Sequence, residues 1–239
     1  MVITGAGSGL GLALAKRFAA RGDSVWGLTR TTQHWKSARR MVAKPDRFHL
    51  AQVDVTSEAA VRRFFKSARN AMGPIDLVVN NAGYSGRPRE LSRLALAEFD
   101  RHLKQNLVSV FLVSKYALPI LRKQKRGLII NISSFAGKRA VPLLAAYSAS
   151  KFGVLALSQA IAKENRDTGP GCITVCPGGI QTGMRAKLFG RAEARKQQPP
   201  DFVADVIMDV VNGKIPVESG GDIVVRHGKV TAINPAPPA

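Results

Sequence analysis

Short apolar runs alternate with longer segments of helical periodicity along most of the chain. The runs are continuous stretches of apolar residues, which is typical of strands in a sheet that is covered on both faces. We expect strands at Val2–Thr4, Ser24–Leu28, Phe48–Val53, Ile75–Asn80, Leu128–Ile132, Ile173–Cys176 and Ile223–Val225. Helices are predicted at Leu10–Arg21 and from about Ser57 to Met72. Thr56 or Ser57 would cap the second helix, because short hydroxyl side chains accept hydrogen bonds from unpaired helix N–H groups.

The strand–helix alternation predicts an α/β fold. Right-handed crossovers would then form a doubly wound parallel sheet of about seven strands with helices on both faces. A chain of 239 residues fits one domain of this class. We assign residues 1–233 to a single domain and the Pro/Ala-rich residues 234–239 to a loose tail.

The composition is that of an ordinary globular protein, with 45% hydrophobic and 22% charged residues. No apolar run approaches the ~18 residues of a membrane span, and the N-terminus lacks the pattern of a signal peptide. We therefore expect a cytoplasmic protein without a membrane segment. Cys172 and Cys176 would lie roughly 13 Å apart on one strand, too far for a disulfide. They are expected to be reduced thiols, and no metal site is expected because further ligands are lacking.

The net charge of +20 is unusually positive. Basic residues cluster at Arg122–Arg126 and between Arg185 and Lys196. A phosphorylated cofactor, an acidic substrate or carrier, nucleic acid, or merely a solvated basic surface would account for this charge. The basic residues have no interleaved aromatic strip, which argues against a nucleic-acid partner.

A glycine-rich turn follows the first predicted strand and opens the first predicted helix. Residues 4–11 read TGAGSGLG. Glycines let the backbone approach a pyrophosphate, and the helix N-terminus presents free N–H groups to the anion. A Gly-x-Gly-x-x-Gly pattern fails at Leu10, whereas Thr-Gly-x-x-x-Gly-x-Gly fits on Gly5, Gly9 and Gly11. The turn therefore predicts a dinucleotide site in a Rossmann-type sheet.

The end of the second strand should carry the group that reads the adenosine ribose. Residues 27–31 contain no acid, and Arg30 offers a planar cation suited to a 2′-phosphate. This favours NADP(H) over NAD(H), although a solvated surface arginine is the alternative. Asp54, after the third strand, would accept from the adenine amino group, and Val55 would flank the ring.

Tyr147 and Lys151 lie four residues apart in an apolar helical stretch, so they share one face. A free tyrosine has a pKa of about 10, and a neighbouring ammonium lowers the pKa by favouring the phenolate. The pair would then serve as an acid or a base. A buried strand ends at Ser133 and Ser134, thirteen residues before Tyr147 in the latter case. Ligands of open α/β sheets bind at such strand ends, so we expect Ser134 beside Tyr147.

With these residues in place, the sequence resembles the short-chain dehydrogenase/reductase family, in the compact branch that includes 3-oxoacyl-carrier-protein reductases and carbonyl reductases. The match runs from about Val2 to Val225. Beyond the residues above it includes Asp54-Val55, Asn80–Gly83, Asn106-Leu107 and Pro177–Thr182. The resemblance implies an NADP(H)-dependent oxidoreductase that transfers a hydride between nicotinamide and a ketone or secondary alcohol.

The resemblance also implies roles for four residues. Tyr147 would be the general acid–base, and Lys151 would lower its pKa and bind the nicotinamide ribose. Ser134 would hydrogen-bond the substrate oxygen, with Ser133 as a rival that the family's spacing disfavours. Asn106 would hold a water in a proton relay.

The cofactor contacts implied by the resemblance are Gly5, Ser8, Gly9, Leu10, Gly11, Arg30, Asp54, Val55, Asn81, Ala82, Gly83, Tyr147, Lys151, Pro177, Gly178, Ile180 and Thr182. Asn80 is expected to tie strands together instead. Ile180 and Thr182 would contact the carboxamide. The chain departs from the family at Ser8, where many NADP-using members carry a basic residue. It also lacks the frequent Val-Asp-Gly-Gly ending near its C-terminus.

The segment from Gly183 to Arg191 mixes apolar and basic residues. In relatives the equivalent segment caps the substrate. Its basic residues here would suit a substrate with an anionic part, and a solvated loop is the alternative. A 3-oxoacyl thioester on an acidic carrier and simpler ketones or alcohols both remain open. A homodimer or homotetramer is expected through Phe99–Leu121 and Tyr147–Lys163, because relatives pair there.

Other classes fit less well. A non-catalytic NADP-binding regulatory protein of the same fold would usually lose the tyrosine or the lysine, and this chain keeps both. Sugar-nucleotide epimerases are longer and have a different glycine spacing. A nucleic-acid binder is suggested by the charge alone.

Overall fold

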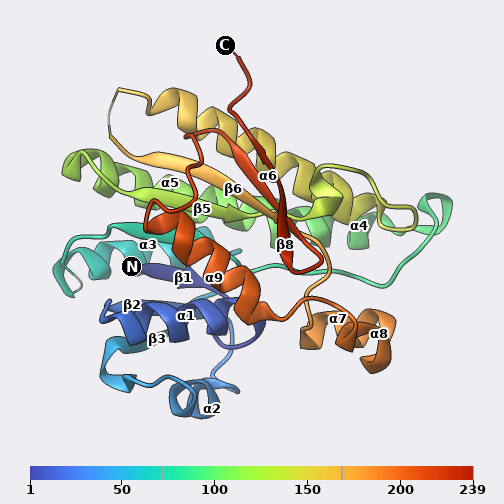
Figure 1. The fold of residues 1–239 in the computed structure, drawn as a ribbon, viewed down its shortest axis with the longest axis horizontal. Coiled ribbons are helices and arrows are strands. Elements are labelled where there is room, and N and C mark those ends of the chain that lie inside the picture. Colours follow the sequence, from blue (N-terminus) through green and yellow to red (C-terminus); the bar gives the residue numbers. More distant parts are fainter. Residues whose placement is uncertain (72, 168, 239) are drawn as a thin grey trace.

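The computed structural model describes residues 1–71, 73–167 and 169–238. Within them, one eight-stranded sheet has the order β3-β2-β1-β4-β5-β6-β7-β8 (Figure 1). Its strands are β1 (Val2–Thr4), β2 (Val25–Thr29), β3 (Phe48–Gln52), β4 (Leu77–Asn80), β5 (Leu128–Ile132), β6 (Gly171–Pro177), β7 (Asp222–Arg226) and β8 (Lys229–Asn234). The first seven pair in parallel, which confirms the predicted doubly wound sheet.

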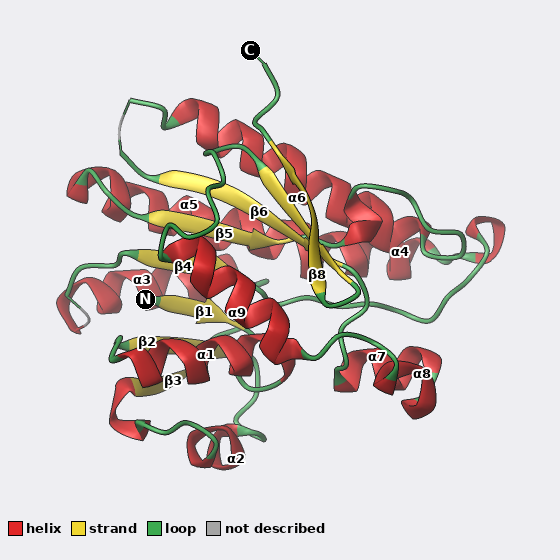
Figure 2. Cartoon of the chain, viewed as in Figure 1, coloured by secondary structure: helices red, strands yellow, loops and turns green. Residues whose placement is uncertain are grey.

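Helices cover both sides of the sheet (Figure 2). They are α1 (Gly9–Arg21), α2 (Trp35–Arg40), α3 (Glu58–Ala71), α4 (Leu96–Leu103), α5 (Ser109–Gln124), α6 (Ala145–Glu164), α7 (Gly183–Phe189), α8 (Arg191–Arg195) and α9 (Pro200–Val211). Short helical turns are η1 (Pro45–Arg47), η2 (Leu91–Arg93), η3 (Lys104–Val108) and η4 (Phe135–Gly137). Of these turns, η3 is a π-helical turn that joins α4 to α5.

Successive residues of the central strands belong to two different cores. On one face, Ile3 of β1 packs in a cluster with residues of α1 and α9. On the other, Val2 packs in a cluster with residues of α3, α5 and α6. The same division separates Val79 from Val78, Ile130 from Ile129 and Ile173 from Cys172. Because both faces are buried, these strands appear in the sequence as continuous apolar runs.

The strand that the sequence reading missed is β8, which pairs antiparallel with β7. The residues of β8 alternate between exposed and partly buried, so β8 lacks the continuous apolar run that predicts the other strands. His227 and Gly228 join the two strands, and both have positive φ, as a two-residue hairpin turn requires. Asn234, assigned to the loose tail, ends β8 and donates to the Asp222 carboxylate at 2.9 Å.

Predicted element boundaries are close to those observed. Ser57 caps α3 by accepting from the backbone N–H of Ala60 at 3.4 Å, as one of the two expected caps. The predicted end of that helix, Met72, lies outside the described residues. The expected helix from Phe99 to Leu121 is divided by the π-helical turn η3, a feature that apolar periodicity does not reveal.

Both cysteines are buried on β6 and unpaired, as predicted. Burial raises the pKa of each thiol to about 12, so both stay protonated at neutral pH. None of the helices in the described part of the chain is long and apolar enough to cross a membrane.

Candidate active site

The order of the strands reverses between β1 and β4, and ligands of open α/β sheets bind at such a point. The loops that follow these two strands are tied together. The Thr4 hydroxyl oxygen accepts from the backbone N–H groups of Asn81 and Ala82, each at 2.9 Å. The Asn81 side chain donates to the Thr4 carbonyl at 2.8 Å. Asn81, predicted to contact the cofactor, therefore braces the glycine-rich loop with its amide.

The glycine-rich loop has the shape of a phosphate cradle. Gly5 and Gly9 have φ of 68° and 54°, a region that side chains disfavour. A Cβ on Gly11 would lie 2.3 Å from the Gly5 carbonyl oxygen, so only glycine fits there. Ser8 precedes α1 and its side chain makes no capping hydrogen bond. The Ser8 side chain thus does not cap the first N–H groups of α1, and such groups can bind an anionic pyrophosphate.

The segment after β6 meets the same loop. A Cβ on Gly9 would lie 3.3 Å from the methyl group of Thr182. Thr182 caps α7 by accepting from the Arg185 backbone N–H at 3.2 Å. Gly178 donates to the Val225 carbonyl at 2.8 Å, and Ile180 pairs with Gln198 in an isolated bridge. Thr182, one of the two predicted carboxamide contacts, therefore lies beside the glycine-rich loop.

Arg30 and Asp54 follow neighbouring strands, β2 and β3, and Arg30 is exposed. Burial acts to raise the pKa of Asp54. Hydrogen bonds from Thr56 at 2.9 and 2.7 Å and the charges of Arg30 and Lys104 nevertheless leave this pKa below its ordinary value. One oxygen of Asp54, the predicted adenine acceptor, is thus engaged with Thr56.

Tyr147, Lys151 and Ser134 meet at the carboxyl end of β5. Tyr147 lies in the first turn of α6, and Lys151 lies one turn further along. Lys151 is 4% exposed, and its Nζ donates to the Ile132 carbonyl at 2.8 Å. The same Nζ lies 5.9 Å from the centre of the Tyr147 ring. Ser134 lies within reach of the Tyr147 phenol, and its interaction with that phenol acts to lower the pKa of Tyr147.

The groups that act on Tyr147 include an unexpected cation. Burial raises the pKa of Tyr147, and the interaction with Ser134 and the Arg185 charge oppose this rise. The cation that opposes the rise is Arg185 on α7, and the expected lowering of this pKa by Lys151 stays a prediction. Burial also lowers the pKa of Lys151 to about 8, and its amine is held by a backbone carbonyl rather than by the phenol.

The two serines after β5 have different partners. Ser133 is 4% exposed and donates its proton to the Lys151 carbonyl at 2.8 Å. Ser134 is partly buried and accepts from the Ala136 N–H at 3.1 Å. In that bond the Ser134 hydroxyl is only an acceptor, so its proton can still be donated to another group. The hydrogen bonding therefore favours Ser134 over Ser133 as the serine that faces a ligand.

Asn106 is completely buried in the π-helical turn. Its Oδ1 accepts from the Tyr84 N–H at 2.7 Å, and its Nδ2 donates to the Tyr84 carbonyl at 2.9 Å and to Ser150 Oγ at 3.0 Å. A Cβ on Gly83 would lie 3.3 Å from Asn106 Oδ1 and 3.7 Å from Lys151 Nζ. The side chain predicted to hold a water is therefore engaged with protein groups next to Lys151.

Sequence reasoning missed several residues of this region, namely Tyr84, Glu98, His102 and Arg185. Tyr84 directly follows the Asn80–Gly83 motif, and Arg185 lies in a segment already expected to cap the substrate. Glu98 and His102 carry no motif. Their proximity to the site depends on how α4 packs against α6, which spacing along the chain does not show.

A family model described as "short chain dehydrogenase" matches residues 1–193. The chain belongs to this family. It is 32% identical to 2-(R)-hydroxypropyl-CoM dehydrogenase from Xanthobacter autotrophicus, over 97% of this chain and 98% of that protein. This short-chain dehydrogenase is thus an oxidoreductase that acts on alcohol or carbonyl groups.

Solved structures of relatives share the fold. ElxO with NADP bound is 26% identical, with a TM-score of 0.85 and 94% of each chain covered. The 3-ketoacyl-(acyl-carrier-protein) reductase from Brucella melitensis, complexed with NADH, is 26% identical with a TM-score of 0.86, covering 95% of this chain and 96% of that one. The two relatives bind different nicotinamide cofactors, so sequence similarity alone does not determine whether this chain prefers NADP(H) or NAD(H).

Proposed function

We propose that this short-chain dehydrogenase uses NADP(H) to interconvert a ketone and a secondary alcohol, with Tyr147 as the general acid–base. The observation that carries the proposal is the meeting of Ser134, Tyr147 and Lys151 at one strand end, beside the glycine cradle. A non-catalytic regulatory protein of the same fold is the alternative. The retained tyrosine and lysine argue against it.

The nicotinamide, when bound, supplies or accepts the hydride. In reduction, negative charge develops on the substrate oxygen, and Ser134 and Tyr147 would both donate hydrogen bonds to that oxygen. One such donor is typically worth about 3–4 kcal/mol. The Tyr147 O–H bond then breaks, its proton forms the alcohol O–H, and the phenolate regains a proton from solvent. Lys151 would bind the nicotinamide ribose, and its charge would support the transient phenolate.

Proton transfer of this kind requires Tyr147 to be protonated before reduction. Burial raises the pKa of Tyr147 above its ordinary value, so the phenol stays protonated at neutral pH. The proposed relay through Asn106 would have to use a group other than its side-chain amide, because that amide is engaged with Tyr84 and Ser150.

The preference for NADP(H) rests on the end of β2. Arg30 is exposed there, and residues 27–31 contain no carboxylate that would repel a 2′-phosphate. Ser8 supplies a hydroxyl rather than a second cation. The glycine cradle with its uncapped α1 N-terminus would hold the pyrophosphate. Val55, Ala82, Leu10 and Pro177 would line the cofactor with backbone or apolar contacts.

A substrate with an anionic part is supported by Arg185. Its charge acts on Tyr147, and its guanidinium contacts the Glu193 carboxylate at 2.8 and 2.6 Å and the Phe189 ring at 4.4 Å. Both side chains of this ion pair are about one-third exposed, so exchanging Glu193 for a substrate anion would cost little. A 3-oxoacyl thioester on an acidic carrier belongs to this class of substrate.

The test is NADPH oxidation, with an NADH control, over matched pairs of neutral and anionic ketones and 3-oxoacyl thioesters. We expect turnover with NADPH and a lower KM for the anionic member of each pair. A preference for NADH would contradict the role of Arg30, and equal KM values would contradict the role of Arg185. Absence of turnover with every ketone would contradict the proposed reaction.

A further inference from the structure

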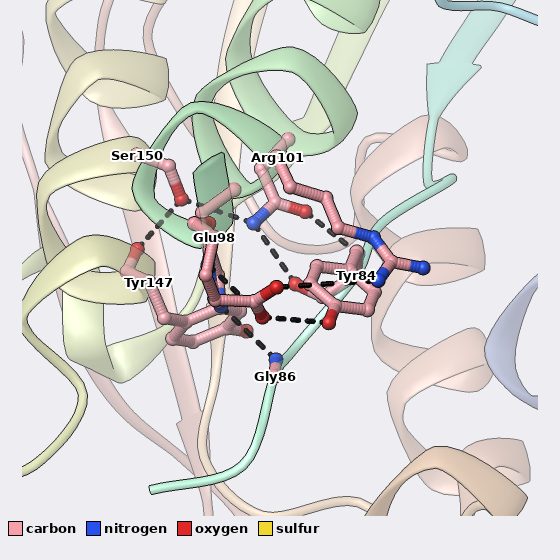
Figure 3. A network of polar contacts seen from close by, with 8 residues as sticks. Tyr84, Gly86, Glu98, Arg101, Tyr147 and Ser150 are labelled. Carbon is pink, nitrogen blue, oxygen red and sulfur yellow. Dashed lines mark hydrogen bonds and ion pairs between the residues drawn. The ribbon is translucent and has the colours of Figure 1, made fainter. Parts of the chain in front are cut away.

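His102 lies beside Tyr147 but belongs to none of the motifs that carry the proposed function. It sits near the end of α4, is 4% exposed, and its ring centre lies 6.4 Å from that of Tyr147. The two rings meet edge to face at 76°, a favoured aromatic geometry. Figure 3 shows the surrounding network, in which Tyr84, Gly86, Glu98 and Ser150 gather near Tyr147.

Backbone partners fix the orientation of the His102 ring. Its Nε2 lies 3.0 Å from the Gly86 N–H, which can only donate, so Nε2 is the acceptor. The proton is therefore on Nδ1, which donates to the Glu98 carbonyl at 2.8 Å. Both ring nitrogens are thus engaged with backbone groups. The ring cannot turn without breaking a buried hydrogen bond.

The segment from Tyr84 to Gly86 holds His102 from its other side. The Tyr84 ring centre lies 5.0 Å from that of His102, and the Tyr84 hydroxyl donates to the Glu98 carboxylate at 2.7 Å. The backbone of Tyr84 is held by Asn106. A Cβ on Gly86 would lie 2.9 Å from His102 Cε1, so glycine is needed for this approach. His102 thus contacts both Tyr84 and Tyr147.

Tyr147 is supported at two points. Its carbonyl accepts from the Ser150 hydroxyl at 2.7 Å, and that hydroxyl accepts from Asn106 at 3.0 Å. This fixes the backbone of the first turn of α6 but leaves the side-chain torsions of Tyr147 free. The His102 ring packs edge-on against the phenol ring itself, which also has the Lys151 amine 5.9 Å from its centre. The position of the phenol matters, since displacing a catalytic group by about 1 Å from the substrate can lower the rate about 10²-fold.

We propose that His102 is a positioning residue, whose fixed ring holds the phenol of Tyr147 with its hydroxyl toward Ser134. The proposal rests on the proposed acid–base role of Tyr147. It assigns no proton transfer to His102, because both of its nitrogens are engaged with backbone groups. Turnover is then expected to need the ring of His102 in the orientation that its two backbone hydrogen bonds fix.

The first experiment compares kcat and KM for His102→Ala, His102→Phe and His102→Gln. We expect His102→Ala and His102→Gln to lower kcat at least tenfold with the KM for NADPH unchanged. His102→Phe, which keeps a ring but loses the two hydrogen bonds that orient it, should recover part of the lost kcat. Ser114→Ala is the matched control, because it removes a buried hydroxyl that bonds Asn80 without contact with Tyr147. Wild-type kcat in His102→Ala, or better recovery by Gln than by Phe, would overturn the proposal.

A second measurement does not depend on turnover. The phenol of Tyr147 is titrated by ultraviolet absorbance, as the difference between each folded variant and the same variant carrying Tyr147→Phe. Arg185, Lys151 and Ser134, which also face the phenol, stay unchanged. Burial raises the pKa of Tyr147, so loss of the covering ring should lower the midpoint in His102→Ala. An unchanged midpoint would overturn the role of His102, whereas failed reduction by the wild type would overturn only the proposed function.

Discussion

Opposing influences act on the hydroxyl of Tyr147. Burial raises its pKa, while the interaction with Ser134 and the Arg185 charge lower it. The spacing of Ser134, Tyr147 and Lys151 along the chain was sufficient to predict that they meet. The effect of Arg185 was not predictable, because the position of Arg185 depends on the fold of α7. Nor was the hydrogen bond from the Lys151 amine to the Ile132 carbonyl.

Tyr147→Phe removes the hydroxyl proton that Tyr147 donates in the proposed reduction. We expect kcat to fall by about 10²–10⁴-fold, the usual contribution of general acid–base catalysis. NADPH binding, measured by fluorescence titration, should be unchanged. Tyr116→Phe is the control, since Tyr116 bonds the exposed Glu58 far from the site. Near-normal turnover by Tyr147→Phe would exclude this tyrosine as the acid.

Arg185→Met removes a cation that stabilises the phenolate. The pKa of Tyr147 should therefore rise further. Reduction needs the protonated phenol and is lost as pH rises through this pKa, so the alkaline limb of the kcat/KM profile should move to higher pH. The measurement is the pH profile of ketone reduction in both proteins. A shift to lower pH would show that Arg185 does not act on Tyr147 in this way.

At the scale of elements, the glycine-rich turn and α1 form the proposed cradle for the pyrophosphate. The order of glycines in the sequence was enough to predict this turn, because Gly5 and Gly9 adopt positive φ and Gly11 packs against Gly5. The π-helical turn around Asn106 was not predicted, since its apolar positions resemble those of a regular helix. β8 was missed because half of its positions are exposed.

Gly11→Ala tests the tightness of the cradle. Alanine usually favours a helix over glycine by about 1 kcal/mol, but here its Cβ would lie 2.3 Å from the Gly5 carbonyl oxygen. We expect the Kd for NADPH to rise at least tenfold and the Tm to fall. Gly183→Ala is the control, because no atom lies within 4 Å of its Cβ position. Equal Kd values for Gly11→Ala and the wild type would rule out close loop packing.

For the whole molecule, the strand order sets where the site lies. The reversal between β1 and β4 brings the glycine cradle and the Asn80–Gly83 motif together, and β5 and β6 place their ends along the same edge. Strand–helix alternation predicted this arrangement. The oligomeric state is harder to predict from the sequence. Small residues on α6 would permit close pairing between subunits, but the packing of α5 and α6 against the sheet of their own chain also uses small residues.

Exposed apolar side chains on the helices expected to pair support a homo-oligomer. Phe111 on α5 and Phe152 on α6 are 45% and 44% exposed. We expect a dimer or tetramer by analytical ultracentrifugation, and dissociation in the double variant Phe111→Glu/Phe152→Glu. Leu91→Glu, at a more exposed leucine outside these helices, should leave the assembly intact. A monomeric wild type would refute pairing through these helices.

The most direct test of the central claim follows the hydride itself. The wild type is incubated with a ketone that it reduces and with NADPH deuterated at the transferable position of the nicotinamide. The product is then analysed by mass spectrometry. We predict one deuterium on the carbinol carbon, formed in the wild type and nearly absent with Tyr147→Phe. An alcohol product without deuterium from either face of the labelled cofactor would contradict the proposed hydride transfer.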